Sequence, residues 1–117
     1  MTKINYPNNL TIGCASKRTT IVATEIRTPK GSPKLYLKTK STDGKPYTIN
    51  EVWIKSYNGK RTTRGLWLDT DVNDQIRRGS ELHRLLESLG ANSVAELVNK
   101  EITVEPKENG FMCIVLE

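Results

Sequence analysis

Apolar and polar side chains alternate strictly over residues 34–40, and this pattern constrains the fold more than any other feature of the sequence. Leu35 and Leu37 fall on one side of an extended strand. The residues on the other side are Lys34, Tyr36, Lys38 and Lys40. A turn signal at residues 43–46 is followed by a second extended run, residues 47–57. We therefore expect a β-hairpin with one apolar face and one face that carries a tyrosine among lysines.

The second run of this hairpin also separates its side chains into two sets. One side carries Trp53, Lys55 and Tyr57, and the other carries Val52 and Ile54. Ile49 is out of phase, which predicts a β-bulge near residues 50–51 or a strand that is buried on both faces at its start. Aromatic rings beside cations suit single-stranded nucleic acid, because each unpaired base that stacks on a ring contributes about 1–3 kcal/mol. The same residues could instead close the end of a barrel or form a subunit contact.

Positive charge is concentrated in the first half of the chain. The net charge of the whole chain is +5, but residues 1–64 carry +10 and residues 65–117 carry −5. Such a division is typical of a protein that binds a polyanion. The residues that we expect to bind nucleic acid are Arg18, Lys34, Tyr36, Lys38, Lys40, Trp53, Lys55, Tyr57, Lys60, Arg61, Arg64 and Trp67.

The segments around the hairpin predict further strands. We expect a short strand over residues 10–15 and a long, bent strand over residues 18–28, which is rich in β-branched residues. Residues 57–65 indicate a flexible basic loop, and residues 66–68 indicate one more short strand. Residues 69–74 superficially resemble a calcium-binding loop but lack its glycine and glutamate, so we expect a turn.

One helix is predicted, over residues 80–89. Its apolar stripe consists of Leu82, Leu85, Leu86 and Leu89. Ser80 is a suitable N-cap, and a capping box at Ser93 and Glu96 predicts a short helical turn. A strand with Ile102 and Val104 on one face follows. Asn109-Gly110 then predicts a hairpin to a strand over residues 111–116 that is covered on both sides.

Length and composition limit the other possibilities. A chain of 117 residues is long enough for one domain, which we expect to span residues 1–117 with residues 1–9 as a flexible arm. No apolar run is long enough to cross a membrane and no signal peptide is evident, so we expect a cytoplasmic protein. Cys14 and Cys113 form no CxxC pair, so we expect free thiols and no zinc site. With a single histidine and no nucleophile beside a base, we expect neither an enzyme nor a cofactor.

Strands, one helix and a closing hairpin, in this order, indicate a fold class. The order predicts a mainly β protein, a five-stranded Greek-key OB-fold barrel with one helix between the third and fourth strands. In this fold the second and third strands carry the binding face. Here these strands would be Lys34–Ser41 and residues 47–57, which hold most of the aromatic and basic residues.

The end of the chain is also similar to a known family. The run SELHRLLESLGANSVAELVNKEITVEPKENGFMCIVLE, after a basic strand-rich half, resembles the C-terminal half of small single-stranded DNA-binding proteins of phages and related viruses. The resemblance implies an OB fold, binding of single-stranded DNA without sequence specificity, self-association as a dimer, and contacts with replication or recombination proteins in a host cytoplasm. Bacterial single-strand binding proteins end in an acidic tail that recruits partners, whereas this chain ends in an apolar run, so we expect no recruitment through such a tail. Two alternatives stay open, a protein-interaction module and an RNA-binding OB domain.

Overall fold

The computed structural model describes residues 16–55 and 58–116, which form a mainly β structure, as predicted. The elements are β1 (Lys17–Arg27), the short 3-10 helix η1 (Pro29–Gly31), β2 (Lys34–Ser41), β3 (Pro46–Ile49), β4 (Glu51–Lys55), β5 (Arg61–Gly65), α1 (Glu81–Ser88), the 3-10 helix η2 (Ala95–Leu97), β6 (Glu101–Pro106) and β7 (Met112–Val115). The expected arm over residues 1–9 and the expected strand over residues 10–15, with Cys14, lie outside the described residues.

Strand β2 has the predicted alternation. It pairs antiparallel with β1 on one side and with β3 on the other. Leu35 and Leu37 are fully buried, whereas Lys38 and Lys40 on the opposite face are exposed. The predicted hairpin between β2 and β3 is confirmed, and the Ser41 backbone N–H donates to the Lys45 carbonyl at 2.9 Å to close it.

Strand β1 is long and irregular, as predicted. Its pairing with β2 shifts register between Ile21 and Ala23, so Val22 is an extra residue in β1. The part before this bulge also pairs with β6, and the last bond on that side is from the Asn99 N–H to the Ile21 carbonyl at 2.7 Å. Val22 and Ile26, in the part that follows, are 51% and 56% exposed.

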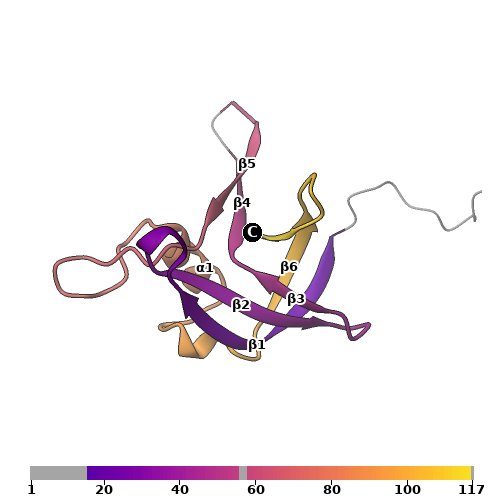
Figure 1. Ribbon diagram of the computed structural model, residues 1–117, viewed down its shortest axis with the longest axis horizontal. Helices are drawn as coiled ribbons and strands as arrows, with labels where there is room; N and C mark the ends of the chain where they lie inside the picture. The colour runs from indigo at the N-terminus through magenta and orange to yellow at the C-terminus, as the bar shows by residue number, and fades with distance from the viewer. Residues whose placement is uncertain (1–15, 56–57, 117) are drawn as a thin grey trace, which may run out of the picture.

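All strands belong to one curved mixed sheet with the order β3-β2-β1-β6-β7-β4-β5 (Figure 1). Strand β4 pairs parallel with β7, and the other pairs are antiparallel. Only Asn50 separates β3 from β4, which confirms the predicted irregularity. The structure therefore shows an open sheet of seven strands where we expected a closed barrel of five. Two changes give the additional strands: the chain breaks at Asn50, which separates β3 from β4, and residues 61–65 form β5. At the break, Leu66 donates its N–H to the Asn50 carbonyl at 2.8 Å and accepts from the Leu35 N–H at 2.8 Å.

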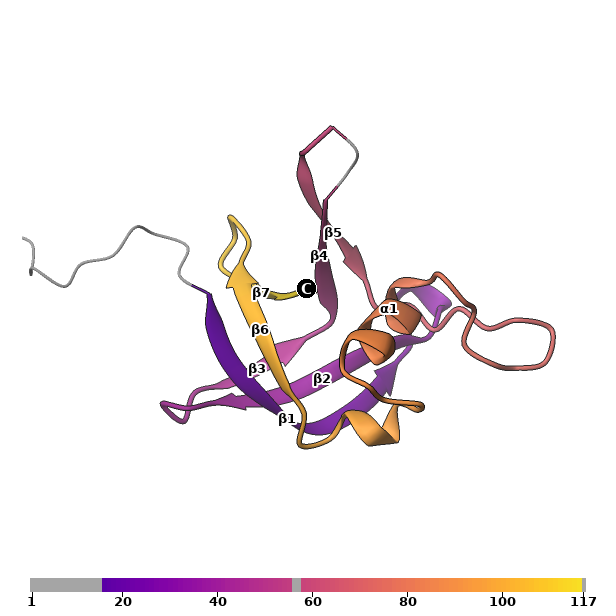
Figure 2. The same cartoon turned by 180° about the vertical axis from the view of Figure 1, so that it is seen from behind.

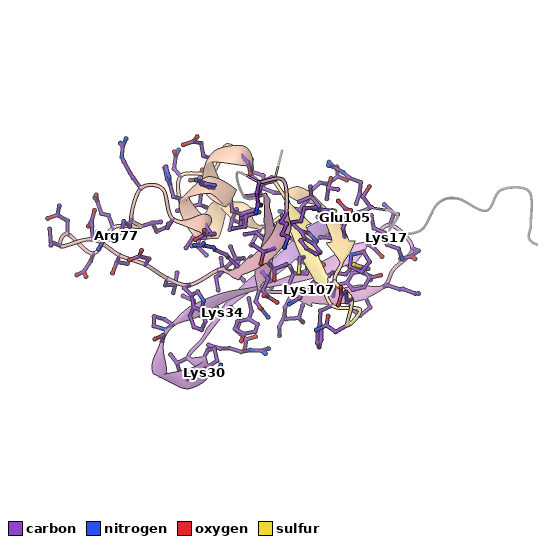
Figure 3. All side chains as sticks on the ribbon, turned by 90° about the horizontal axis from the view of Figure 1, so that it is seen from above. Lys17, Lys30, Lys34, Arg77, Glu105 and Lys107 are labelled. Atoms are coloured by element: carbon purple, nitrogen blue, oxygen red, sulfur yellow. The ribbon has the colours of Figure 1, made fainter. Side chains whose placement is uncertain are left out.

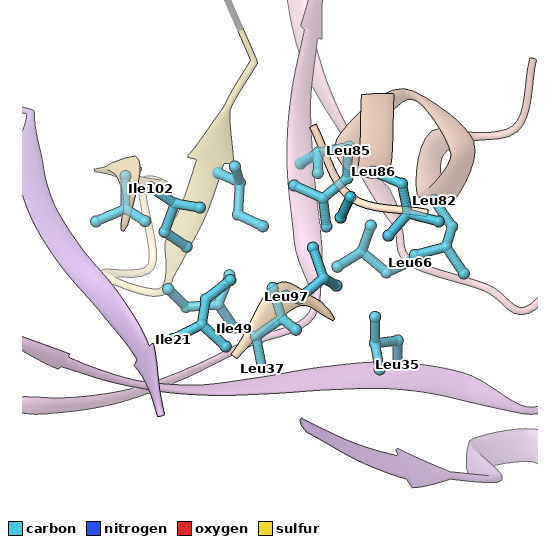
Figure 4. Close-up of a cluster of buried hydrophobic side chains, with 14 residues drawn as sticks. Ile21, Leu35, Leu37, Ile49, Leu66, Leu82, Leu85, Leu86, Leu97 and Ile102 are labelled. Carbon is cyan, nitrogen blue, oxygen red and sulfur yellow. The ribbon is translucent and has the colours of Figure 1, made fainter. Parts of the chain in front are cut away.

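The predicted helix is confirmed as α1, between β5 and β6. The Ser80 side chain caps it and accepts from the His83 backbone N–H at 3.2 Å. Figure 2 shows α1 beside the curved sheet, and Figure 4 shows its leucines converging with Leu35, Leu37 and Ile21 from the strands. Leu82 and Leu85 are fully buried, and each such side chain contributes about 1.5–3 kcal/mol to the free energy of folding.

The expectation of a loop over residues 57–65 was wrong for residues 61–65, which form β5. Strand β5 pairs with β4 through a hairpin at Asn58-Gly59, where Asn58 Oδ1 accepts from the Lys60 N–H at 3.1 Å and Gly59 has a φ of 85°. The expected strand over residues 66–68 is instead an isolated bridge between Trp67 and Lys34.

The C-terminal hairpin of β6 and β7 is confirmed. Asn109 Oδ1 accepts from the Phe111 N–H at 3.1 Å in its turn. Phe111 was expected in a strand covered on both sides, but it is 68% exposed because it precedes β7 and belongs to the turn. The predicted short helical turn is present as η2, but the predicted capping box is not formed: Val94 is the N-cap without a side-chain cap hydrogen bond, and Glu96 Oε2 accepts from the Asn92 N–H at 2.9 Å and from the Ser93 hydroxyl at 3.4 Å.

The segment between β5 and α1 begins with the predicted turn. Asp71 Oδ1 accepts from the backbone N–H groups of Asn73 and Gln75 at 2.8 and 3.1 Å. These hydrogen bonds lower the pKa of the Asp71 carboxyl. The carboxylate therefore serves the turn itself, as expected for a segment that is not a calcium loop.

Candidate nucleic-acid interface

The outer face of β1 and β2 carries the first cluster of predicted residues. The alternation of β2 directs Tyr36 outward, and the register places Glu25 of β1 opposite it. The guanidinium of Arg27 lies over the Tyr36 ring, 4.5 Å from its centroid. Arg27 was not among the predicted residues, although its period-two spacing from Glu25 was visible in the sequence.

Glu25 joins two cations in this cluster. Its Oε2 accepts from Arg27 Nη2 at 2.7 Å and from Arg27 Nε at 3.0 Å, and Lys38 Nζ lies 3.8 Å away. The hydrogen bonds from Arg27 lower the pKa of the Glu25 carboxyl, and the charges of Arg27 and Lys38 lower it further. The carboxylate is therefore ionised and neutralises part of the positive charge that the sequence indicated.

A second cluster lies around Trp67. Lys34 and Trp67 face each other across the isolated bridge, and Lys34 Nζ is 4.7 Å from the Trp67 ring centroid. Gly65 lies beneath both, since a Cβ built there would be 2.6 Å from Lys34 Cε and 2.8 Å from Trp67 Nε1. A side chain at this position would displace both groups, so the missing Cβ of Gly65 provides the space in which they meet.

An open hollow of about 470 Å³ adjoins Trp67. Its other lining residues are Lys30, Ser32, Pro33, Leu68 and Asp69. Trp67 is 39% exposed. The ring thus has free surface and space beside it in addition to the contact with Lys34.

A third cluster surrounds Trp53 on β4. The Trp53 Nε1–H donates to the Glu105 backbone carbonyl at 3.1 Å. Because β7 lies between β4 and β6 in the sheet, the indole extends across β7. Arg61 lies over the ring at 4.5 Å, and its two Nη atoms donate to the two carboxylate oxygens of Glu105 at 3.3 and 3.2 Å. The guanidinium, rather than the indole, is therefore the outer layer of this stack.

The turn between β6 and β7 borders the third cluster. A groove of about 350 Å³ is lined by Trp53, Arg61, Thr62, Thr63, Lys107, Glu108 and Asn109. Lys107 Nζ lies 3.1 Å from Glu51 Oε1. Burial, together with a smaller effect of the negative charge of Glu51, raises the pKa of the nearby Cys113 thiol to about 11. Lys107 and the exposed Phe111 are site candidates that the sequence analysis missed.

The second cluster is connected to both of the others: Lys34 and Tyr36 lie on the same side of β2, and β5 leads from the second cluster to the third. Gly65 and Thr63 alternate with inward residues along β5, and Thr63 is directly opposite Trp53. Thr63 and Trp67 are four residues apart, which corresponds to a distance of about 13 Å at the usual rise of a β-strand. In Figure 3 Lys34 and Lys107 lie over the middle of the molecule, whereas Lys30 and Arg77 lie at its periphery.

Several predicted residues do not join these clusters. Arg18 is separated from Trp53 by β6 and β7, and it pairs with Glu101 at 3.0 Å. Arg64 is opposite the inward-facing Val52 and lies 3.9 Å from Glu81 of α1, so it faces away from Trp53. Lys40 is exposed on the outer face of β2, and Lys60 lies in the turn before β5. Tyr57 and the Lys55 side chain lie outside the described part of the chain.

Comparison of the chain with models of protein families, with curated proteins and with solved structures found no match. In residues 16–55 and 58–116, no three histidine, cysteine, aspartate or glutamate side chains are grouped as ligands for a metal ion. In the same residues, no helix has the length and apolar character needed to span a membrane.

Proposed function

We propose that the three clusters bind single-stranded DNA without sequence specificity, in replication or recombination. The observation that carries the proposal is the presence of three aromatic rings, each with a cation 4.5–4.7 Å from its centroid. Bases stack on such rings or on guanidinium planes, and the phosphates between the bases require nearby cations. The function is thus supported by three contacts between an aromatic ring and a cation, because a single strand needs rings for its bases and cations for its phosphates.

The strand order supports an OB-type barrel as the framework. If β3 and β4 count as one strand interrupted at Asn50, then β1, β2, β3 with β4, β6 and β7 are five strands, and α1 lies between the third and fourth. The parallel pair of β4 and β7 would join the ends of this barrel. In this description β5 is an additional strand, and each cluster has a member on the second or third strand, namely Tyr36, Lys34 and Trp53, where OB-folds bind their ligands.

In the proposed complex the aromatic clusters hold bases and the surrounding cations hold phosphates. Trp67 and Tyr36 supply rings, and Arg61 supplies a guanidinium plane above Trp53. Lys34, Lys38 and Lys107 neutralise phosphates, together with Arg61. Each neutralised phosphate releases counterions, so the binding constant should fall with salt with a logarithmic slope of about −0.7 per contact. No catalytic step and no cofactor belong to this proposal.

A protein partner is the second candidate, and it is favoured by the exposure of Val22 and Ile26 on β1. These two apolar side chains could contact a second copy of the chain or a replication protein, as the resemblance to phage and viral proteins implies. A dimer in the cytoplasm, of the host if the protein is viral, is compatible with DNA binding because Ile26 is opposite the inward-facing Leu35, on the other face of β1 from Glu25 and Arg27. RNA is the alternative ligand for the same clusters.

The test is a titration with dT oligomers of increasing length, followed by intrinsic tryptophan fluorescence, at low and at high salt. Lys34→Gln and Lys45→Gln form a pair, since both remove one lysine charge, but the half-buried Lys34 contacts a ring and the exposed Lys45 does not. We expect tight binding that weakens with salt. Lys34→Gln should reduce the slope by about 0.7, and Lys45→Gln should leave it unchanged.

Duplex DNA and rU oligomers of the same length are the competitors. Weak binding to duplex supports a face that needs unpaired bases, and equal binding to rU would assign RNA as an equivalent ligand. Absence of dT binding at low salt, or equal affinity for duplex, would disprove the proposal. A search for protein partners of Val22 and Ile26 would follow in that case.

A further inference from the structure

Two of the three aromatic clusters share one construction. In each, a guanidinium lies 4.5 Å above a ring and is bound at the same time by a glutamate: Arg27 over Tyr36 by Glu25, and Arg61 over Trp53 by Glu105. The third cluster differs. Among the described residues no carboxylate pairs with Lys34 over Trp67, so this cation is engaged by the ring alone.

The carboxylates of Glu25 and Glu105 accept hydrogen bonds from the same guanidinium N–H groups that would bind a phosphate. Arg27 donates Nε–H and Nη2–H to Glu25, and Arg61 donates from both Nη atoms to Glu105 in a fork. A guanidinium binds carboxylate and phosphate through the same pairs of parallel hydrogen bonds. A phosphodiester carries one negative charge, like the glutamate that it would replace.

Each position also has the surroundings of a phosphate subsite. Glu25 lies between Arg27 and Lys38, so a phosphate there would contact two cations. Glu105 lies next to the groove of about 350 Å³ beside Trp53, and Lys107 lines the same groove. Stacking on the rings fixes the guanidinium groups in place, so they remain available when the carboxylate leaves.

We propose that Arg27 with Lys38, and Arg61, form two phosphate subsites for a single strand, and that Glu25 and Glu105 are internal competitors that occupy them in the free protein. This inference rests on the proposed function. Ion pairs between exposed side chains contribute little to stability because water screens them, so a phosphate can displace Glu25, whose side chain is 39% exposed, at low cost; Glu105 is 20% exposed and should leave its arginine less readily. The cluster of Lys34 and Trp67 needs no such exchange, and it is where a strand binds first.

The test compares three isosteric substitutions, Glu25→Gln, Glu105→Gln and Glu101→Gln. Glu101 is the matched control, because it pairs with Arg18 at 3.0 Å without an aromatic ring beneath the guanidinium. All three raise the net charge by one. In dT titrations at low salt we expect Glu25→Gln and Glu105→Gln each to tighten binding about threefold to fivefold. Glu101→Gln should change it less than about twofold, because Glu101 pairs with Arg18, which lies outside the three clusters.

A second arm tests whether each glutamate acts through its own arginine. In an Arg61→Gln background, Glu105→Gln should have no effect on affinity, whereas Glu25→Gln should keep its full effect. Weaker binding by Glu25→Gln and Glu105→Gln would overturn the inference, because the carboxylates would then position the guanidinium groups instead of competing. Gains no larger than that of Glu101→Gln would also overturn it. If the wild type binds and the gains are absent, this inference alone fails, whereas no binding by any of the proteins refutes the proposed function as well.

Discussion

The two faces of β2 differ in what surrounds them, although their residues alternate along one strand. Leu35 and Leu37 are fully buried among the strands and α1, whereas Tyr36 and Lys38 lie on the outer face with Arg27 and Glu25. Leu35 and Leu37 belong to the apolar core cluster, whereas the outer residues contact charges that a ligand could replace. We therefore expect substitutions on the inner face to change stability and substitutions on the outer face to change binding.

The largest effect should come from Leu37→Ala. Removing this buried side chain should lower the free energy of unfolding by about 2–5 kcal/mol, because it loses apolar contacts and leaves a cavity. Urea denaturation followed by circular dichroism measures the change. Lys38→Ala, one residue away on the outer face, is the control and should change stability by no more than about 0.5 kcal/mol. Equal losses in the two variants would refute the separation of the faces.

Trp67→Ala should have the next largest effect, on binding. Loss of one stacking ring should cost about 1–3 kcal/mol, or roughly 5- to 150-fold in the dissociation constant for a dT oligomer. Fluorescence anisotropy of a labelled oligomer measures it, since the variant lacks one intrinsic fluorophore. Trp67→Phe keeps a ring and should retain most of the affinity. Unchanged binding by Trp67→Ala would remove this ring from the interface.

Gly65→Ala tests whether the missing Cβ at this position allows Lys34 and Trp67 to contact each other. The new Cβ would collide with Lys34 Cε and Trp67 Nε1, which belong to side chains that can move. We expect stability to change by about 0.5 kcal/mol or less, whereas loss of the cation–ring contact should weaken dT binding roughly twofold to fivefold. Thr42→Ala, in the exposed turn between β2 and β3, should leave binding unchanged. A large loss of stability would show that Gly65 serves the fold rather than the site.

The smallest expected effect is the pH dependence that arises from Cys113, and it tests whether this thiol is buried next to the third cluster. Its pKa of about 11 lies above that of an unfolded thiol, so folding favours the neutral form. The resulting stabilisation is complete below about pH 8.5, the usual thiol pKa, and is lost as the pH rises through 11. In a Cys14→Ser variant, alkylation by iodoacetamide should be slow at pH 8 and accelerate toward pH 11. Rapid alkylation at pH 8 would contradict this placement.

Sequence patterns predicted the elements whose side chains alternate between solvent and core. Strand β2, helix α1 and the hairpin at Asn109-Gly110 belong to this group, because local spacing decides which face of each is buried. Strand β5 was missed because Arg61 to Gly65 contains no apolar residue. It is a strand because β4 offers it a free edge and Asn58-Gly59 turns the chain, and this dipeptide was the signal that could have identified it.

The sequence predicted which residues of β2 lie on the outer face, but it did not predict which side chains contact one another there. Tyr36 and the lysines of β2 could be placed from alternation alone. Which cation lies over which ring depends on registers between strands distant in sequence, such as Lys34 opposite Trp67 and the contact of Arg61 with Glu105. The net charge also concealed that glutamates from β1, β4 and β6 lie among the cations. Arg64 was misplaced because its strand was expected to be a loop, in which no face is defined.

The bulge at Val22 determines which changes in length the chain can accept during evolution or in engineering. Side chains alternate with a period of two, so the extra residue lets one continuous strand keep Ile21 in the core and Glu25 outside while it serves two neighbours. Deleting Val22 would leave Ile21 opposite Thr39 and Ala23 opposite Lys38 in regular alternation, whereas a deletion or insertion of one residue elsewhere in β1 would turn one half of the strand inside out. Insertions should therefore be tolerated in the segment around Val72, which is 97% exposed, and selected against in β1. That segment is the natural place to attach a label or an affinity tag.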